Sequence, residues 1–101
     1  MYICNAFSLQ MLPSTGGNVT VSPITKEGVR ALKLVSAIGH ADTSAVVSDL
    51  LDIALPANRV SLKLQPGDAV IVAQIQGGRL PEGATTLPSG IVIKFFKVDI
   101  N

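Results

Sequence analysis

The sequence predicts one α/β domain of the α+β kind, spanning residues 1–101, in which a mixed sheet of roughly five strands packs against two main helices. The length leaves room for a single hydrophobic core. Hydrophobic residues make up 48% of the chain and aromatic residues only 4%, so the core is expected to be aliphatic. Because so short and apolar a chain often completes its burial by association, we expect a homodimer.

The N-terminal part is expected to hold two strands. Residues 2–7 are typical of a first strand, and Ser8 can cap a short helical turn directly after it. Further on, Val19 and Val21 alternate with polar residues, which predicts a short second strand. Pro23 cannot donate a hydrogen bond to a neighbouring strand, so this second strand is expected at an edge of the sheet.

Two helices are expected in the middle of the chain. Thr25 can cap the first, whose apolar residues recur every third position as far as about Ile38, and Gly39 ends it. The second helix carries apolar residues at spacings of three and four and ends before Pro56. Its cap is one of three polar residues, Asp42, Thr43 or Ser44.

The C-terminal half is expected to be β. Residues 60–64 alternate as a half-buried strand does, a turn follows at 66–68, and further strands are expected at 69–76 and 91–98. The 77–90 loop between the last two strands holds four glycines and two prolines. Loops longer than about 12 residues in compact domains are commonly functional, so we predict a lid that closes on a ligand. The alternative is an ordinary disordered surface loop.

Composition excludes several classes of function. A formal net charge of +1 argues against a protein that coats long DNA or RNA, although a few well-placed cations can still hold a small anion. Cys4 is the only cysteine, so we expect it to be a small buried hydrophobe rather than part of a disulfide or a metal site. Neither a signal peptide nor a membrane span is recognisable, so a cytoplasmic protein is expected. We expect no metal and no cofactor, because no motif for either occurs.

His40 is the only histidine and lies at or just before the N-terminal end of the second expected helix. A lone histidine is more often structural than catalytic, but free N–H groups at a helix N-terminus favour a bound anion. A histidine beside a phosphate can donate a proton near neutral pH. Arg79 and Glu82 in the 77–90 loop, and Arg59 before residues 60–64, either serve such a ligand or are ordinary surface charges.

These residue types permit cleavage of RNA without a metal. The 2′-hydroxyl of the substrate can attack the neighbouring phosphorus, and the protein need only align the groups and protonate the leaving 5′-oxygen. One histidine, one or two arginines and a carboxylate are enough for that chemistry. The residues permit this reaction without selecting it.

Three groups of residues then occur in order along almost the whole chain. They are Asn5–Ser8 with Met11 and Leu12, Ser36–His40 with Thr43 and Ser44, and a third group from Asn58–Val60 through Lys63, Leu64, Gly67, Asp68 and Gln74 to Gly78–Gly83. In this combination they resemble the small viral and bacterial ring nucleases that act as type III anti-CRISPR proteins. Residues 13–23 match no part of that pattern.

The resemblance implies a homodimer whose pocket binds cyclic tetra-adenylate, the second messenger of type III CRISPR defence, and cleaves it to linear di-adenylate with 2′,3′-cyclic phosphate ends. A two-fold pocket suits a ring of four identical nucleotides. By resemblance, His40 is the general acid, while Arg79 and Glu82 come from the lid to meet phosphate charge and position the site. The substrate-binding residues implied in the same way are Asn5, Ser8, Gly39, Thr43 and Arg59.

Two other classes of function stay open. In the first, the same dimer binds the cyclic nucleotide without cutting it, which predicts saturation at one ring per dimer and no linear product. In the second, the chain is a structural or protein-interaction module in which His40 is incidental. This module would show no thermal shift with cyclic oligoadenylates.

Overall fold

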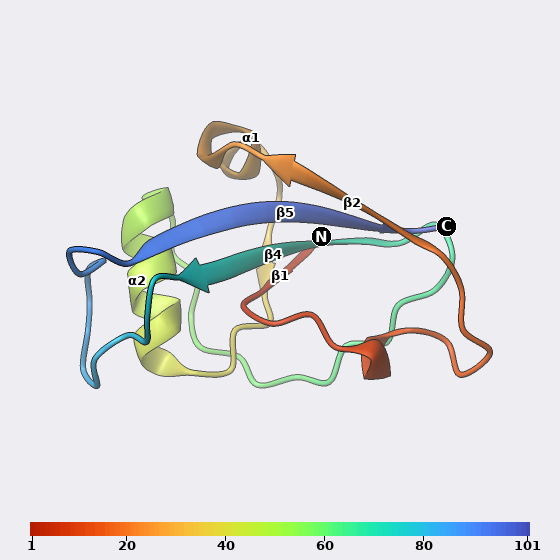
Figure 1. Ribbon diagram of the computed structural model, residues 1–101, viewed down its shortest axis with the longest axis horizontal. Helices are drawn as coiled ribbons and strands as arrows, with labels where there is room; N and C mark the ends of the chain where they lie inside the picture. Colours follow the sequence, from red (N-terminus) through yellow and green to blue (C-terminus); the bar gives the residue numbers. More distant parts are fainter.

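The sheet of the computed structural model, which describes residues 1–101, has five strands in the order β2-β5-β4-β1-β3 (Figure 1). The strands are β1 (Tyr2–Cys4), β2 (Val19–Ile24), β3 (Val35–Ser36), β4 (Ala69–Gln76) and β5 (Val92–Ile100). β1 pairs in parallel with β3 and β4, whereas β5 is antiparallel to β4 and β2. The predicted α+β fold with a mixed sheet is therefore confirmed. β2 pairs with β5 alone, which confirms its place at an edge.

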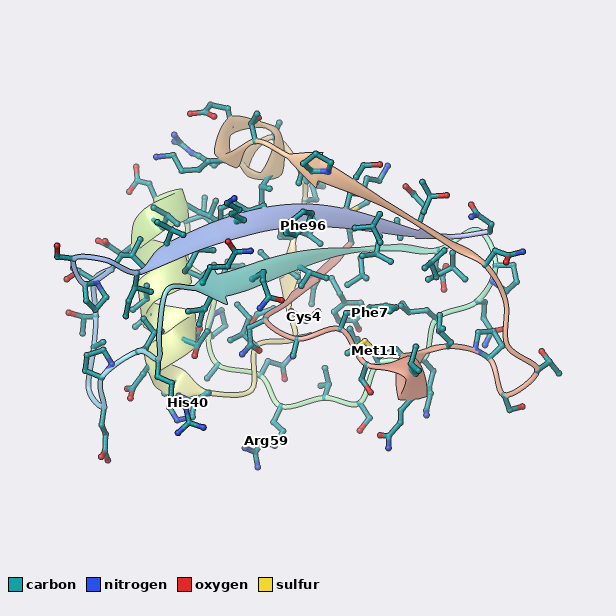
Figure 2. The ribbon with its side chains drawn as sticks, in the orientation of Figure 1. Cys4, Phe7, Met11, His40, Arg59 and Phe96 are labelled. Atoms are coloured by element: carbon teal, nitrogen blue, oxygen red, sulfur yellow. The ribbon has the colours of Figure 1, made fainter.

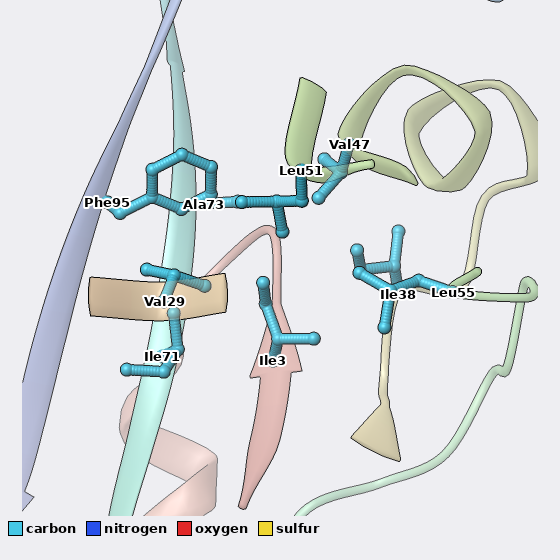
Figure 3. Close-up of a cluster of buried hydrophobic side chains, with 9 residues drawn as sticks. All are labelled: Ile3, Val29, Ile38, Val47, Leu51, Leu55, Ile71, Ala73 and Phe95. Atoms are coloured by element: carbon cyan, nitrogen blue, oxygen red, sulfur yellow. The ribbon is translucent and has the colours of Figure 1, made fainter. Parts of the chain in front are cut away.

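Helices α1 (Lys26–Arg30) and α2 (Ala41–Leu51) pack on one face of the sheet. Thr25 Oγ1 caps α1, as expected, by accepting the N–H of Gly28 at 3.1 Å. Figure 3 shows the core between helices and sheet, which is aliphatic except for one phenylalanine and comprises Ile3, Val29, Ile38, Val47, Leu51, Leu55, Ile71, Ala73 and Phe95. No helix of the chain reaches the length and hydropathy of a membrane span.

The opposite face of the sheet is covered by irregular chain. A short 3-10 helix, η1 (Leu9–Met11), follows β1, and Ser8 Oγ caps it by accepting the N–H of Gln10 at 3.2 Å. The second core cluster lies here and includes Cys4, Leu62 and Leu64, with Phe7 and Met11 packed against it (Figure 2). Cys4 is buried as expected, and this burial raises the pKa of its thiol.

The helix expected from Thr25 to Ile38 is wrong. α1 ends at Arg30, and the chain then turns into β3, where the N–H of Val35 donates to Met1 O at 2.9 Å and the N–H of Ala37 to Ile3 O at 2.8 Å. Val35 is 51% exposed whereas Ile38 is fully buried, so the two residues do not share one helical face. Pairing with β1 outweighs the local helical spacing because it satisfies the backbone of an otherwise unpaired sheet edge.

The strand expected at 60–64 is also wrong, although the alternation of burial is right. Leu62 and Leu64 are buried, but the segment pairs with no strand and is held instead by the N–H of Leu64, which donates to Met11 O at 2.7 Å. β3 takes its place as the fifth strand. Three elements also end at other residues than expected. The first strand ends at Cys4 rather than residue 7, the second helix ends at Leu51 rather than just before Pro56, and the last strand extends to Ile100 rather than residue 98.

Candidate functional site

The parallel half of the sheet brings three chain segments to one edge. β1, β3 and β4 run in the same direction, so Asn5, the chain up to His40, and the 77–90 loop all begin at neighbouring carboxyl ends. From β1 the chain goes to β2 at the far edge of the sheet and reaches β3 only after α1, and it then returns through α2 to β4 on the other side of β1. In open α/β sheets a crevice outside the carboxyl ends of the strands is the usual place for a ligand.

An open groove of about 1000 Å³ lies at this edge, and we call it the His40 groove. Its walls include five of the eight predicted site residues, namely Asn5, His40, Thr43, Arg79 and Glu82. Ile75 from β4 and Leu80 from the 77–90 loop add apolar surface. Residues far apart in the sequence therefore meet in one cavity, among them His40, Arg79 and Glu82, the three residues for which the resemblance implies a catalytic role.

The other three predicted residues lie outside the groove lining. The hydroxyl of Ser8 is engaged in capping η1. Gly39 packs against Arg59, since a Cβ placed on Gly39 would lie 3.4 Å from Arg59 Cβ. Arg59 is exposed and in Figure 2 projects from the same side of the molecule as His40. A ligand that extends beyond the groove past His40 would therefore reach Arg59.

The position of Arg59 is set by its neighbour Asn58. The backbone N–H of Asn58 donates to Ile38 O at 2.8 Å, and its side-chain amide donates to Ser36 O at 2.7 Å. These bonds fasten the chain before Arg59 to the segment that leads into His40. The backbone at Arg59 is thus fixed beside this segment, and its exposed guanidinium forms no ion pair.

His40 is the N-cap residue of α2. Its φ of −114° and ψ of 128° are extended, its carbonyl accepts the N–H of Ser44 at 3.0 Å, and its imidazole makes no capping hydrogen bond. The N–H groups of Ala41, Asp42 and Thr43 likewise have no partner within the chain. An exposed imidazole therefore stands beside free amide groups and the positive end of a helix dipole, where an anion is favoured.

The charged side chains of the groove are unpaired. The chain has one ion pair, between Lys97 and Asp99 at 3.5 Å, and it lies outside the groove lining. Arg79 and Glu82 are exposed and engage no other side chain. Within a single chain the groove therefore offers one guanidinium and two carboxylates, those of Asp42 and Glu82, to a ligand.

The 77–90 loop is narrow at its base and attached at its tip. A Cβ on Gly77 would overlap the carbonyl oxygen of Gly90, so the two ends of the loop lie in close contact. At the tip, the N–H of Ala84 donates to Pro81 O at 3.1 Å and closes a turn, and the N–H of Gly83 donates to Asp42 Oδ2 at 2.8 Å. Apart from a local turn at the base of the loop, where the N–H of Ile91 donates to Pro88 O at 3.2 Å, this last bond is the one hydrogen bond between residues 77–90 and the rest of the chain.

Replacing Gly77 with alanine is expected to destabilise the base of the loop. Gly77 has a φ of +94°, and the added methyl would also collide with Gly90. Gly67→Ala is the matched control, because Gly67 has a φ of +95° but open space around it. We expect Gly67→Ala to cost about 1 kcal/mol of unfolding free energy and Gly77→Ala clearly more, as measured by urea denaturation. Equal losses would show that no close contact exists at the base.

Sequence reasoning missed Asp42 and Gly83 as residues of the site. Asp42 stood out only as one of three possible helix caps, although it follows His40 by two positions. Gly83 directly follows Glu82. Their proximity to predicted site residues was a usable signal, but the bond between them depends on the fold.

Comparison with known proteins places the chain in a family of small viral proteins. Residues 1–91 match the profile of the STIV B116-like family, and the chain belongs to that family. Among solved structures it is similar to B116 of Sulfolobus turreted icosahedral virus, with a TM-score of 0.75 and 27% identity, over 97% of each chain. It is also similar to Uncharacterized protein 26 of Sulfolobus islandicus filamentous virus (isolate Iceland/Hveragerdi), at 29% identity over 87 residues, which are 82% of this chain and 73% of that relative. These relatives are viral proteins, which agrees with the viral side of the resemblance.

Proposed function

We propose that this protein is a metal-independent ring nuclease that binds cyclic tetra-adenylate and cleaves it to linear di-adenylate with 2′,3′-cyclic phosphate ends. The observation that carries the proposal is the meeting of His40, Arg79 and Glu82 in one groove at the N-terminus of α2. Together they provide a proton donor, a cation and a carboxylate around free backbone amides. Membership of a viral family supports a role in ending type III CRISPR signalling, because a virus gains when that signal is removed.

The reaction needs only groups that the chain or the substrate holds. The substrate 2′-oxygen forms a bond to phosphorus and releases its proton to water, the bond from phosphorus to the 5′-oxygen breaks, and the His40 imidazolium protonates that leaving oxygen. The unpaired Arg79 guanidinium and the amides of α2 balance the phosphate charge. Glu82, from the loop over the groove, orients the reacting ribose.

A second copy of the chain is part of the proposal. The groove is open and holds one guanidinium, whereas a ring of four nucleotides carries a phosphate at each link. Exposed apolar side chains on both edge strands, Val19 and Val21 on β2 and Val35 on β3, support association. Two facing grooves would each take half of the ring.

The deciding experiment is incubation of the purified protein with cyclic tetra-adenylate in EDTA, with the products separated by chromatography. Linear di-adenylate with cyclic phosphate ends is the expected product, at a binding ratio of one ring to two chains. An intact ring bound at the same ratio would mean a protein that sequesters the messenger. Absence of binding would overturn the nuclease and favour a protein-interaction module.

Replacing Arg79 with alanine is expected to weaken binding of the ring by about ten- to a hundredfold, because a charge-assisted hydrogen bond contributes roughly 1.5–3 kcal/mol. The salt dependence of binding should also become shallower, since one phosphate contact is lost. Titrations at two salt concentrations measure both effects. Arg30→Ala is the matched control, because Arg30 is exposed at the end of α1 and outside the groove. Equal losses in the two variants would contradict a specific role for Arg79.

A further inference from the structure

We infer that Asp42 is a positioning residue, which fixes the tip of the 77–90 loop on the first turn of α2 and thereby sets Arg79 and Glu82 relative to His40. The inference rests on the proposed function for its catalytic consequence. Its structural basis is the bond from the N–H of Gly83 to Asp42 Oδ2 at 2.8 Å. The only other hydrogen bond between the loop and the rest of the chain is a local turn at its base, where the N–H of Ile91 donates to Pro88 O.

The bond between Gly83 and Asp42 joins two residues that are close in sequence to the proposed reacting residues. Asp42 follows the proposed acid His40 by two positions, and Gly83 is the residue after Glu82. The turn closed between Pro81 and Ala84 makes Glu82 and Gly83 one small rigid unit. Holding Gly83 on the helix therefore also holds Glu82 near His40.

Without this bond, little else would hold the loop in register. Gly77, Gly78, Gly83 and Gly90 all adopt positive φ angles, where glycine keeps more backbone freedom than other residues. The tip is exposed, so water competes for the same N–H group. Misplacing a reacting group by about 1 Å can lower the rate up to roughly a hundredfold. A single hydrogen bond at the tip can therefore affect catalysis strongly.

The hydrogen bond of Asp42 favours catalysis, whereas its negative charge disfavours binding of the substrate. A carboxylate in the first turn of a helix is favoured by the helix dipole, but it also repels an entering phosphate. Asp42→Asn keeps an oxygen that can accept the N–H of Gly83 and removes the charge. Asp42→Ala removes both. The pair of variants therefore separates the hydrogen bond from the electrostatic effect.

The first measurement is the exchange rate of the Gly83 amide proton by NMR, without any ligand. We expect exchange to be several-fold faster in Asp42→Ala and close to wild type in Asp42→Asn. Asp49→Ala is the control, since Asp49 is an exposed carboxylate on the same helix with no such bond. Unchanged exchange in Asp42→Ala would overturn the inference, whether or not the protein is a nuclease.

The second measurement is single-turnover cleavage of cyclic tetra-adenylate together with its dissociation constant. We expect Asp42→Ala to cleave about tenfold more slowly, through a lower rate at saturation rather than weaker binding. Asp42→Asn should lose much less rate than Asp42→Ala and should bind the ring more tightly than the wild type at low salt, with a difference in affinity that shrinks as salt is added.

The outcomes separate this inference from the proposed function. Equal loss of rate in both Asp42 variants would overturn the hydrogen-bond role and leave the charge as the cause. If the wild-type protein leaves the ring intact, the proposed function fails, and Gly83 exchange still decides whether Asp42 fixes the loop. A thermal melt of each variant shows whether a loss of rate reflects unfolding.

Discussion

His40→Ala is expected to lower the rate of ring cleavage by about 10²–10⁴-fold while the dissociation constant of cyclic tetra-adenylate changes little. The imidazole is exposed and makes no capping hydrogen bond, so its loss removes the proton donor without removing a structural contact. Single-turnover kinetics give the rate, and an equilibrium titration gives the affinity.

His40→Asn is the control for a structural effect of this substitution. Asparagine is a good N-cap residue for α2 but cannot serve as a general acid at neutral pH. We therefore expect it to retain or raise the thermal stability while it loses as much cleavage rate as alanine does. Two results would contradict the role of His40 as the acid. One is faster cleavage by His40→Asn than by His40→Ala, and the other is an equal loss of binding affinity and cleavage rate in either variant.

Leu51→Ala is expected to lower the free energy of unfolding by about 2–5 kcal/mol, a large share of the roughly 5–15 kcal/mol typical of such domains. Leu51 is the last residue of α2, is fully buried, and lies near Ala73 and Phe95 in Figure 3. Its truncation leaves a cavity where the helix meets the sheet. Urea denaturation measures the loss through the midpoint at an unchanged slope.

Leu9→Ala makes the same chemical change at a site that is 79% exposed, and it should shift the stability by less than about 0.5 kcal/mol. Because His40 caps the helix that ends at Leu51, the active fraction of Leu51→Ala should follow its folded fraction. Cyclic tetra-adenylate should then restore part of the stability by binding the folded state. Similar midpoints for the two leucine variants would contradict the assigned core.

Local chemistry explains what could be predicted about the fold. Thr25 and Ser8 were identified as caps because their hydroxyl groups accept N–H groups two or three residues away. Pro23 marked an edge strand because it lacks an N–H group, and the strand expected at 69–76 is present as β4. Each of these signals is complete within a few residues of sequence.

The two wrong predictions, a helix that reaches Ile38 and a strand at 60–64, depend on contacts between residues distant in the sequence. Val35 lies in a strand rather than a helix because its N–H group meets Met1, which is distant in sequence. The alternation of Leu62 and Leu64 correctly indicated one buried face, but it could not show that the segment packs over the sheet without joining it. Periodicity reports burial, whereas strand pairing depends on backbone partners elsewhere in the chain.

For the candidate site, the residues themselves could be picked from the sequence, and His40, Arg79 and Glu82 do line one groove. Their meeting, however, was decided by the parallel pairing of β1 with β3 and β4, which brings three carboxyl ends to one edge. The same pairing placed Ser8 outside the groove and made Asp42 the partner of Gly83. The sequence by itself determines which residue types are available for the site. The distances between these residues depend on long-range backbone hydrogen bonds and on shared burial, which no short stretch of sequence indicates.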